Sequence, residues 1–358
     1  MRIGVVKETK PGERRVALTD AGARTLSTDG HDVLVESGAG LGAGITDDDY
    51  EGAGAKIVSV ADAWAAELVV KVKEPVAAEY DRLREETVLF TYLHLAADRP
   101  LTEALLQRRV TAIAYETVVD DRGELPLLKP MSEVAGRLAA HAAGHYLMDP
   151  AGGPGLLLGG SPGVPPARVT VLGGGVVGTQ AALLAVGMRA DVTILDTSPH
   201  RVRELEEQFG RQLQVLHSQG GPAISAVRES DVVIGAVLVP GAAAPQLLTR
   251  DDLRLLKPGA LLIDVAIDQG GCFETSRPTT YEAPTYQVDG ITHYCVANMP
   301  GGVPRTSTRA LTNATLPYVR HLAGLGVNAA FDRDPGLRRG LNTRAGAITH
   351  EAVAAAFG

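Results

Sequence analysis

One glycine-rich turn between two apolar runs constrains the fold of this 358-residue chain more than any other feature. The run RVTVL, residues 168–172, precedes Gly173, Gly175 and Gly178. An apolar helical pattern follows, and a second apolar run ends at Asp196. In a Gly-x-Gly-x-x-Gly turn the first glycine permits the tight turn and the second lets the backbone approach a pyrophosphate. The third lets the helix pack on the strand, so the stretch predicts a βαβ dinucleotide-binding unit.

Asp196 also indicates which dinucleotide binds. It lies about 20 residues beyond the turn, where an acidic side chain accepts hydrogen bonds from the adenosine ribose. A carboxylate repels a 2′-phosphate, so NAD is favoured over NADP. The predicted helix from Val176 adds unpaired N–H groups and a positive dipole end for the phosphates. The alternative is a purely structural glycine turn, which the order of strand, helix and acidic terminus makes the weaker interpretation.

Strand-like and helix-like runs alternate along most of the chain. Runs typical of strands lie in residues 1–8, 31–37, 68–74, 87–95, 111–118, 168–173, 191–196, 213–218, 231–237 and 260–266. Helical patterns lie in 20–30, 76–85 and 101–109, and begin at or near Val176, Pro199, Gly221 and Thr249. The alternation predicts parallel sheets with helices on their faces, and the length favours two domains. The predicted fold class is α/β with two Rossmann-like doubly wound sheets.

Other segments complete this plan. The Gly- and Pro-rich residues 151–167 indicate a loop, and 287–299 a further strand or hairpin. Residues 131–149 and 306–326 indicate two long helices, and Ser132 is the expected N-cap of the first. The tail after them is expected to be partly helical.

Charge and cysteine usage exclude several classes of protein. A formal net charge of −8 and the absence of a basic run argue against nucleic acid or an anionic membrane as partner. No segment approaches the ~20 apolar residues that a membrane span needs. Cys272 and Cys295 lack the spacing of a zinc site or a disulfide framework. The first residues indicate a strand rather than a signal peptide, so a cytoplasmic location is expected.

Four side chains stand where a small charged substrate could bind. Lys73 and His94 lie at the ends of predicted parallel strands, the edge at which open α/β sheets bind ligands. Asp268 follows another apolar strand and precedes two glycines. Arg15 lies after the first strand, where Arg14 is an equal candidate. Taken singly, each cation is more often a solvated surface charge, and a lone histidine is more often structural.

His141 and His145 form an i, i+4 pair on the first long predicted helix. This is metal-ligand spacing, but a zinc HExxH site would need glutamate where the chain has Ala142. A helix-face or interface pair is the favoured interpretation, and no metal is expected.

The chain resembles the L-alanine dehydrogenase family. The blocks that carry the resemblance include RRVALT, LVVKVKEP, FTYLHLAAD, GGGVVG, DVAIDQGGCFETSRPTT, HYCVANMPG and TSTRALTNATLPY. They occur in unbroken order from Met1 to about Gly340. The resemblance implies an NAD-binding Rossmann domain, 129–305, inserted in a substrate domain made of 1–128 and 306–358. The two long helices would then form the hinge crossings.

The resemblance also implies site residues. Arg15, rather than Arg14, would hold the pyruvate carboxylate, and Lys73 would be the substrate lysine. His94 would be the acid/base and Asp268 the catalytic aspartate. The implied cofactor contacts are Ser132, Gly173, Gly175, Val176, Val177, Gly178, Asp196, Ser218, Val237, Leu238, Ile267, Asp268, Asn298 and Met299. Ala243 and Arg309 depart from the family pattern without touching the four chemical positions.

The implied reaction is NAD-dependent oxidative deamination of L-alanine to pyruvate and ammonium, together with the reverse reductive amination. The family is typically homo-hexameric. One alternative is the NAD-binding subunit of a proton-pumping transhydrogenase, which would partner a membrane protein. A second is a non-catalytic NAD-binding protein. The joint presence of Lys73, His94 and DQGG favours the dehydrogenase over both.

Overall fold

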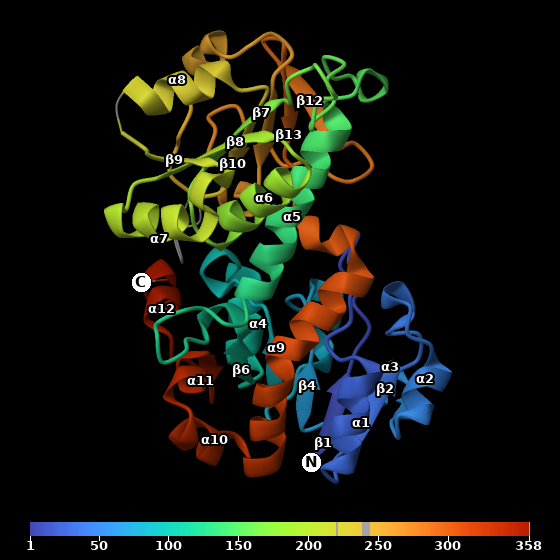
Figure 1. The fold of residues 1–358 in the computed structure, drawn as a ribbon. Helices are drawn as coiled ribbons and strands as arrows, with labels where there is room; N and C mark the ends of the chain where they lie inside the picture. Colours follow the sequence, from blue (N-terminus) through green and yellow to red (C-terminus); the bar gives the residue numbers. More distant parts are fainter. Residues whose placement is uncertain (220, 238–243, 358) are drawn as a thin grey trace. The chain divides into compact units, whose positions relative to one another are not determined.

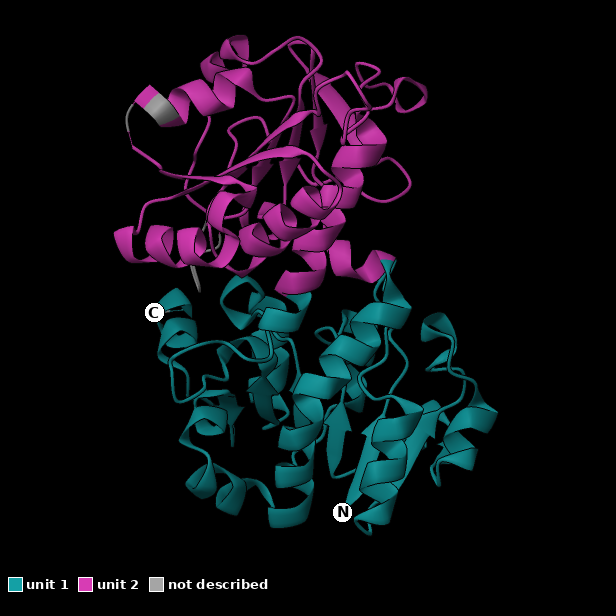
Figure 2. Ribbon diagram, in the orientation of Figure 1, with its two compact units in different colours: residues 1–131, 303–358 teal, residues 132–302 magenta. Residues whose placement is uncertain are grey.

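The computed structural model describes residues 1–219, 221–237 and 244–357. The chain divides into two compact units (Figure 2). Unit 1 comprises Met1–Met131 and Val303–Gly358, and unit 2 comprises Ser132–Gly302 between them in the chain. Leu238 and Ala243, named above, lie outside the described residues. Within the described ranges, no helix has the length and apolar character needed to cross a membrane.

Unit 1 is built on a sheet with the order β15-β14-β6-β5-β4-β1-β2-β3 (Figure 1). Strands β1 to β6 pair in parallel, and β14 and β15 add antiparallel partners beside β6. The order 3-2-1-4-5-6 of the parallel strands is that of a doubly wound sheet. The strands are β1 Arg2–Val5, β2 Asp32–Glu36, β3 Lys56–Val58, β4 Leu68–Val70, β5 Val88–Thr91, β6 Thr111–Ala114, β14 Leu341–Arg344 and β15 Ala347–Ile348.

The helices of unit 1 follow the strands. The α-helices are α1 Asp20–Thr28, α2 Asp47–Gly52, α3 Val60–Trp64, α4 Arg99–Gln107, α9 Pro304–Leu325, α10 Val327–Arg333, α11 Pro335–Arg339 and α12 Glu351–Phe357. Short 3-10 helices are η1 Leu41–Ala43, η2 Ala77–Arg82, η3 Leu95–Ala97 and η4 Tyr115–Thr117. Helix α5, Lys129–Tyr146, starts in unit 1 and continues into unit 2.

Unit 2 contains a second sheet, ordered β12-β13-β11-β10-β7-β8-β9. Its strands are parallel except β12, which forms an antiparallel hairpin with β13. The strands are β7 Arg168–Leu172, β8 Asp191–Asp196, β9 Gln214–His217, β10 Val232–Gly235, β11 Leu261–Asp264, β12 Thr285–Val288 and β13 Ile291–Tyr294. The helices are α6 Val176–Gly187, α7 Pro199–Phe209, α8 Gly221–Glu229 and the 3-10 helices η5 Asp149–Ala151, η6 Gly210–Gln212, η7 Asp251–Leu255, η8 Ile267–Gln269 and η9 Met299–Gly302.

The core of unit 2 shows why these runs form strands. In β11, Leu261 and Ile263 pack in the cluster that includes α5, α6 and α7, whereas Leu262 packs with α8 and the loop after β10. Alternate side chains of a strand point to opposite faces, so a strand buried on both faces is apolar throughout. Figure 1 shows α6 and α7 on one face of this sheet and α8 on the other.

The predicted fold class is confirmed by the two parallel-dominated sheets. The predicted N-cap at Ser132 is wrong, because α5 already starts at Lys129. Lys129 N–H donates to Leu125 O at 3.0 Å, and Pro130 stands early in the helix, where its missing N–H is tolerated. Ser132 therefore lies inside the first turn.

Two further predictions about secondary structure are wrong. The segment 76–85 forms only the 3-10 helix η2, in which Glu79 pairs with Lys71. The predicted helix near Thr249 is the 3-10 helix η7. The tail is partly helical, as predicted, and it also supplies the short strands β14 and β15, which lack an extended apolar strand pattern.

A buried charge cluster supports the loop after β4. Lys71 Nζ lies 2.7 Å from Glu8 Oε2 and 3.5 Å from Glu79 Oε2, and these side chains are at most 2% exposed. Glu8 Oε1 also accepts the N–H of Val72 at 2.6 Å. Burial alone would lower the pKa of Lys71, but the two carboxylates outweigh it and raise that pKa. The lysine is therefore a structural cation that neutralises buried carboxylates.

We expect Lys71→Met to lower the free energy of unfolding by about 3–5 kcal/mol, because it leaves Glu8 and Glu79 buried without their cation. Urea unfolding followed by circular dichroism measures the loss. The matched control is Lys56→Met, which breaks an exposed pair with Asp32 and should cost less than about 1 kcal/mol. Equal, small losses in both variants would contradict a structural role for Lys71.

Candidate functional site

Two candidate residues of unit 1 lie in loops beyond adjacent parallel strands. β4 ends at Val70 and β5 at Thr91, so Lys73 and His94 lie three residues past their strands rather than at the strand ends predicted. The difference arises because the chain continues buried through residues 71–72 and 92–93 before it turns. Thr91 Oγ1 donates to Lys73 O at 3.0 Å, which joins the two loops. Both residues therefore lie at the carboxyl edge of the sheet.

His94 occupies a strained turn. Its φ is 52° and its ψ 35°, in the left-handed region that non-glycine residues rarely adopt. Glu116 Oε1 accepts the N–H of His94 at 2.6 Å and that of Leu93 at 3.1 Å. The same oxygen lies 3.8 Å from His94 Nδ1. The imidazole is about half exposed and lies parallel to the ring of Tyr92, with centroids 6.0 Å apart.

Arg15 is a buried, fixed cation. Its Nε and Nη2 donate to the carboxylate oxygens of Glu13 at 2.7 and 2.5 Å, and Nη1 donates to Met131 Sδ at 3.0 Å. Burial alone would lower the pKa of the guanidinium, but its hydrogen bonds with Glu13 outweigh this and raise that pKa. Arg14, the other candidate, is exposed. A buried, preorganised guanidinium suits the orientation of a carboxylate better than a mobile surface one.

The glycine turn of unit 2 has the geometry that its spacing predicts. Gly173 has a φ of 101°, which favours glycine. A Cβ on Gly178 would lie 1.8 Å from Gly173 O, so helix α6 packs against the turn only because that side chain is absent. A Cβ on Gly175 would meet nothing within 4 Å among the described residues, and no side chain there caps the first turn of α6. The turn thus offers exposed backbone and N–H groups to a pyrophosphate.

Asp196 closes the turn from the end of β8. Its Oδ2 accepts the N–H of Gly174 at 2.8 Å, and its Oδ1 accepts the N–H of Ser198 at 2.8 Å. Ser218 N–H donates to Asp196 O at 2.9 Å, so the loop after β9 lies beside it. Asp196 therefore joins the glycine turn to the loops that follow β8 and β9.

The remaining predicted cofactor residues that the structure describes also follow parallel strands of unit 2, apart from Ser132 on α5. Val237 follows β10, and a Cβ on Gly173 would lie 2.8 Å from its side chain. Ile267 starts η8 after β11, and Asn298 and Met299 follow β13. Because parallel strands share one carboxyl edge, these residues and the glycine turn gather at one edge of the sheet. This set of backbone N–H groups, one acidic terminus and an uncapped helix fits NAD.

Asp268 lies on a loop folded around a second aspartate, Asp264. Asp264 is fully buried and accepts the N–H groups of Ala266 at 3.0 Å and Cys272 at 2.8 Å. Gly270 and Gly271 have φ values of 92° and 80°, so the loop turns where side chains would be strained. Asp268 lies on the outside of this loop and is not one of the groups hydrogen-bonded to Asp264.

The carboxylate of Asp268 faces the loop after β13. Its two oxygens lie 3.3 and 3.2 Å from the N–H of Asn298, which has a left-handed φ of 54°. The two predicted site residues are therefore in contact. The strand β11 delivers a carboxylate to the carboxyl edge of the sheet, and the glycines keep its surroundings open.

Sequence reasoning missed the carboxylates that support these loops, namely Glu8, Glu13, Glu116 and Asp264. A signal existed for Asp264, since an aspartate inside the apolar run LLIDVAI cannot be buried without donors. The roles of Glu8, Glu13 and Glu116 could be recognised only from the fold. Glu8 and Glu116 accept N–H groups of other loops, and Glu13 accepts the N–H of Arg15, two residues further along the chain. None of the four is recognisable from spacing alone.

Cys272 and the histidine pair on α5 have different surroundings. Cys272 is buried, and desolvation raises the pKa of its thiol. His141 and His145 are exposed on α5. In the part of the chain that the structure describes, no three His, Cys, Asp or Glu side chains cluster to hold a metal ion.

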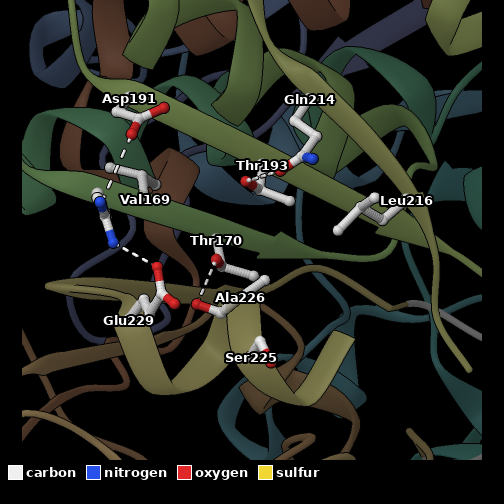
Figure 3. Close-up of a pocket in the computed structure, with 10 residues that line it drawn as sticks. Val169, Thr170, Asp191, Thr193, Gln214, Leu216, Ser225, Ala226 and Glu229 are labelled. Carbon is white, nitrogen blue, oxygen red and sulfur yellow. Dashed lines mark hydrogen bonds and ion pairs between the residues drawn. The ribbon is translucent and has the colours of Figure 1, made fainter. Parts of the chain in front are cut away.

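A cavity of about 380 Å³ lies on the sheet of unit 2, away from these loops (Figure 3). Its lining includes Arg168, Asp191 and Gln214, which are the first residues of β7, β8 and β9. It therefore lies at the amino edge of the sheet. Arg168 bridges Asp191 and Glu229 across it, and Figure 3 shows these contacts. None of the predicted site residues lines it.

Comparisons with known proteins cover the whole chain. The family model described as the alanine dehydrogenase/PNT N-terminal domain matches residues 4–135, and the C-terminal one matches 139–351. The chain is 57% identical to an alanine dehydrogenase of Halomonas elongata over 360 aligned residues, 100% of this chain and 97% of that protein. A solved structure of an L-alanine dehydrogenase superposes with a TM-score of 0.97 at 51% identity, covering 100% of this chain and 99% of the other. A transhydrogenase structure from Sinorhizobium meliloti gives 0.85 at 26% identity, covering 98% and 100%.

We expect Gly178→Ala to weaken NAD binding at least tenfold and to destabilise unit 2 by about 1–3 kcal/mol, because the added methyl meets a backbone carbonyl that cannot move aside. Fluorescence titration and thermal unfolding measure the two effects. The control is Gly187→Ala near the end of the same helix, where an added Cβ meets nothing within 4 Å among the described residues. That variant should bind NAD normally, and equal NAD affinities for the two variants would contradict the role given to Gly178.

Proposed function

The chain belongs to the alanine dehydrogenase/PNT family, and from this premise we propose which residues perform its reaction. It catalyses NAD-dependent oxidative deamination of L-alanine to pyruvate and ammonium, and the reverse reductive amination. The predicted resemblance is thus confirmed. The observation that carries the proposal is that Arg15, Lys73, His94 and Asp268 all lie on loops supported by carboxylates.

Unit 1 is proposed as the substrate domain. Arg15 orients the substrate carboxylate, since a planar guanidinium can make two parallel hydrogen bonds with it. Glu13 holds the guanidinium in place through two of its nitrogens, which fixes the orientation of Arg15. Lys73 binds the carboxylate or the carbonyl oxygen and stabilises charge that develops on oxygen.

His94 and Asp268 are proposed to handle protons and charge. Deamination requires water to add to an iminium and the resulting carbinolamine to lose ammonia. His94 serves as the acid/base, because an imidazole titrates near neutral pH. Asp268 balances the cationic iminium and positions the water or ammonia. Its glycine neighbours leave room for these small molecules.

Unit 2 is proposed as the NAD-binding domain. The glycine turn and the N-terminus of α6 would hold the pyrophosphate, and Asp196 the adenosine ribose. Ser132, Val237, Leu238, Ile267, Asn298 and Met299 are proposed to complete the binding surface. Bound NAD supplies the acceptor for the hydride that leaves the substrate Cα. We further propose a homo-hexamer, which light scattering would test by a mass six times that of the chain.

The alternative function is that of a transhydrogenase subunit, and it is supported by the similarity to the transhydrogenase structure. Its identity of 26% is half the 51% found with the L-alanine dehydrogenase structure. The direct test is to mix the purified protein with L-alanine and NAD and to follow NADH absorbance. NADH should appear only when both L-alanine and NAD are present. If no NADH forms with L-alanine, tested within a broad panel of amino acids, the proposal is overturned.

We expect Asp268→Asn to lower turnover about 100-fold or more while NADH binding persists, because the amide fills the same space without the charge that balances the iminium. Steady-state kinetics and NADH fluorescence separate the two effects. Asp251→Asn, which removes an exposed carboxylate from η7, serves as the control. Near-normal turnover of Asp268→Asn would remove this aspartate from the mechanism.

We expect His94→Ala to lose most of the rate and to abolish the acidic limb of the kcat/KM profile for deamination, because the titrating base is gone. A pH series from about 5 to 10 covers the imidazole range. His141→Ala, on the exposed face of α5, controls for loss of a histidine elsewhere. If the limb survives in His94→Ala, another group is the base.

A further inference from the structure

We propose that Glu116 is the positioning residue for His94: its carboxylate fixes the backbone turn of His94 and holds the orientation of the imidazole ring. This inference rests on the proposed role of His94 as acid/base. Glu116 lies in η4, directly after β6, the strand that pairs in parallel with β5. A single carboxylate thus reaches from one loop at the carboxyl edge to the next.

The first argument is conformational. A left-handed conformation costs a non-glycine residue about 1–2 kcal/mol. Two consecutive N–H groups, those of Leu93 and His94, point at the carboxylate of Glu116, which accepts both. Hydrogen bonds from two N–H groups to a charged acceptor offset that cost. Without Glu116 the turn would relax, and the direction of the imidazole would change with it.

The second argument is electrostatic. Glu116 Oε1 lies 3.8 Å from Nδ1 of His94, and its side chain is 15% exposed. A carboxylate on this side of the ring favours the tautomer with the proton on Nδ1. Nε2 is then the nitrogen left to exchange protons with the substrate. A carboxylate on the far side of the ring from the reacting nitrogen is also the arrangement found in catalytic triads.

Other charged groups lie on the elements around this turn. They are Tyr92 on the same segment, Lys73 in the loop after β4, Asp98 after η3, Arg99 and Glu103 of α4, and Glu351 of α12. Asp98 accepts the N–H of Leu101 at 3.0 Å, and Arg99 pairs with Glu103. Glu116 differs from them because the structure places its oxygen within 4 Å of the ring.

The test is the split between kcat and KM for deamination in Glu116→Gln. The amide keeps the size of the side chain and removes its charge. Turnover should fall about tenfold, because a neutral amide oxygen accepts the two N–H bonds more weakly than a carboxylate does. The KM for pyruvate in the reverse reaction should change less than about twofold, since Arg15 and Lys73 are untouched.

Two variants complete the experiment. Glu116→Asp keeps a charged acceptor, so it should recover part of the turnover that Glu116→Gln loses. Glu103→Gln removes an exposed carboxylate from α4 and should leave both kcat and KM unchanged. Circular dichroism and thermal unfolding of each variant account for any loss of folded protein, so that turnover is compared per folded molecule.

The outcomes separate this inference from the proposed function. If His94→Ala abolishes the limb, and Glu116→Gln loses turnover that Glu116→Asp partly recovers, both stand. If His94→Ala abolishes the limb but Glu116→Gln keeps near-normal turnover, the role of Glu116 is overturned and that of His94 remains. If the limb survives in His94→Ala, the acid/base assignment fails first, and the inference about Glu116 fails with it.

Discussion

Carboxylates that accept backbone N–H groups hold the loops that carry the proposed site residues. Glu8 binds the loop of Lys73, Glu13 that of Arg15, and Glu116 that of His94. In unit 2, Asp264 gathers the N–H groups of the loop that carries Asp268. Hydrogen bonds to charged acceptors are stronger than neutral ones, and a buried carboxylate left without donors is costly. The hydrogen bonds that fix the loops therefore also compensate for the cost of burying these carboxylates.

Both units place such loops at the carboxyl edge of a parallel sheet with strand order 3-2-1-4-5-6. In unit 1 the proposed substrate cations are Arg15 and Lys73, and the guanidinium of Arg15 is buried against Glu13. Unit 2 uses this edge to present backbone N–H groups, through Gly175 and the first turn of α6. The division matches the chemistry of the two ligands, since a keto acid requires fixed positive charge and a pyrophosphate can be held by peptide dipoles.

Much of the fold could be predicted from the sequence, but few of the contacts that hold the loops of the proposed site could. Apolar strands and the glycine turn have local patterns, so the two sheets and the position of Asp196 followed from them. Strands β14 and β15 did not, because they are short: β14 gains its place by pairing with β6, and the two-residue β15 by pairing with β14. Glu116 lies 22 residues from His94, and only the pairing of β5 with β6 brings their loops together. Contacts of this kind depend on tertiary structure, which no spacing rule encodes.

The central claim is that preorganised cations on carboxylate-supported loops hold the keto acid. A crystal structure of the protein with pyruvate and NADH tests it most directly. The account predicts the pyruvate carboxylate at about 2.7–3.2 Å from nitrogen atoms of Arg15 and Lys73, with Glu13 still paired to the guanidinium. Pyruvate bound elsewhere, with neither cation in contact, would contradict it.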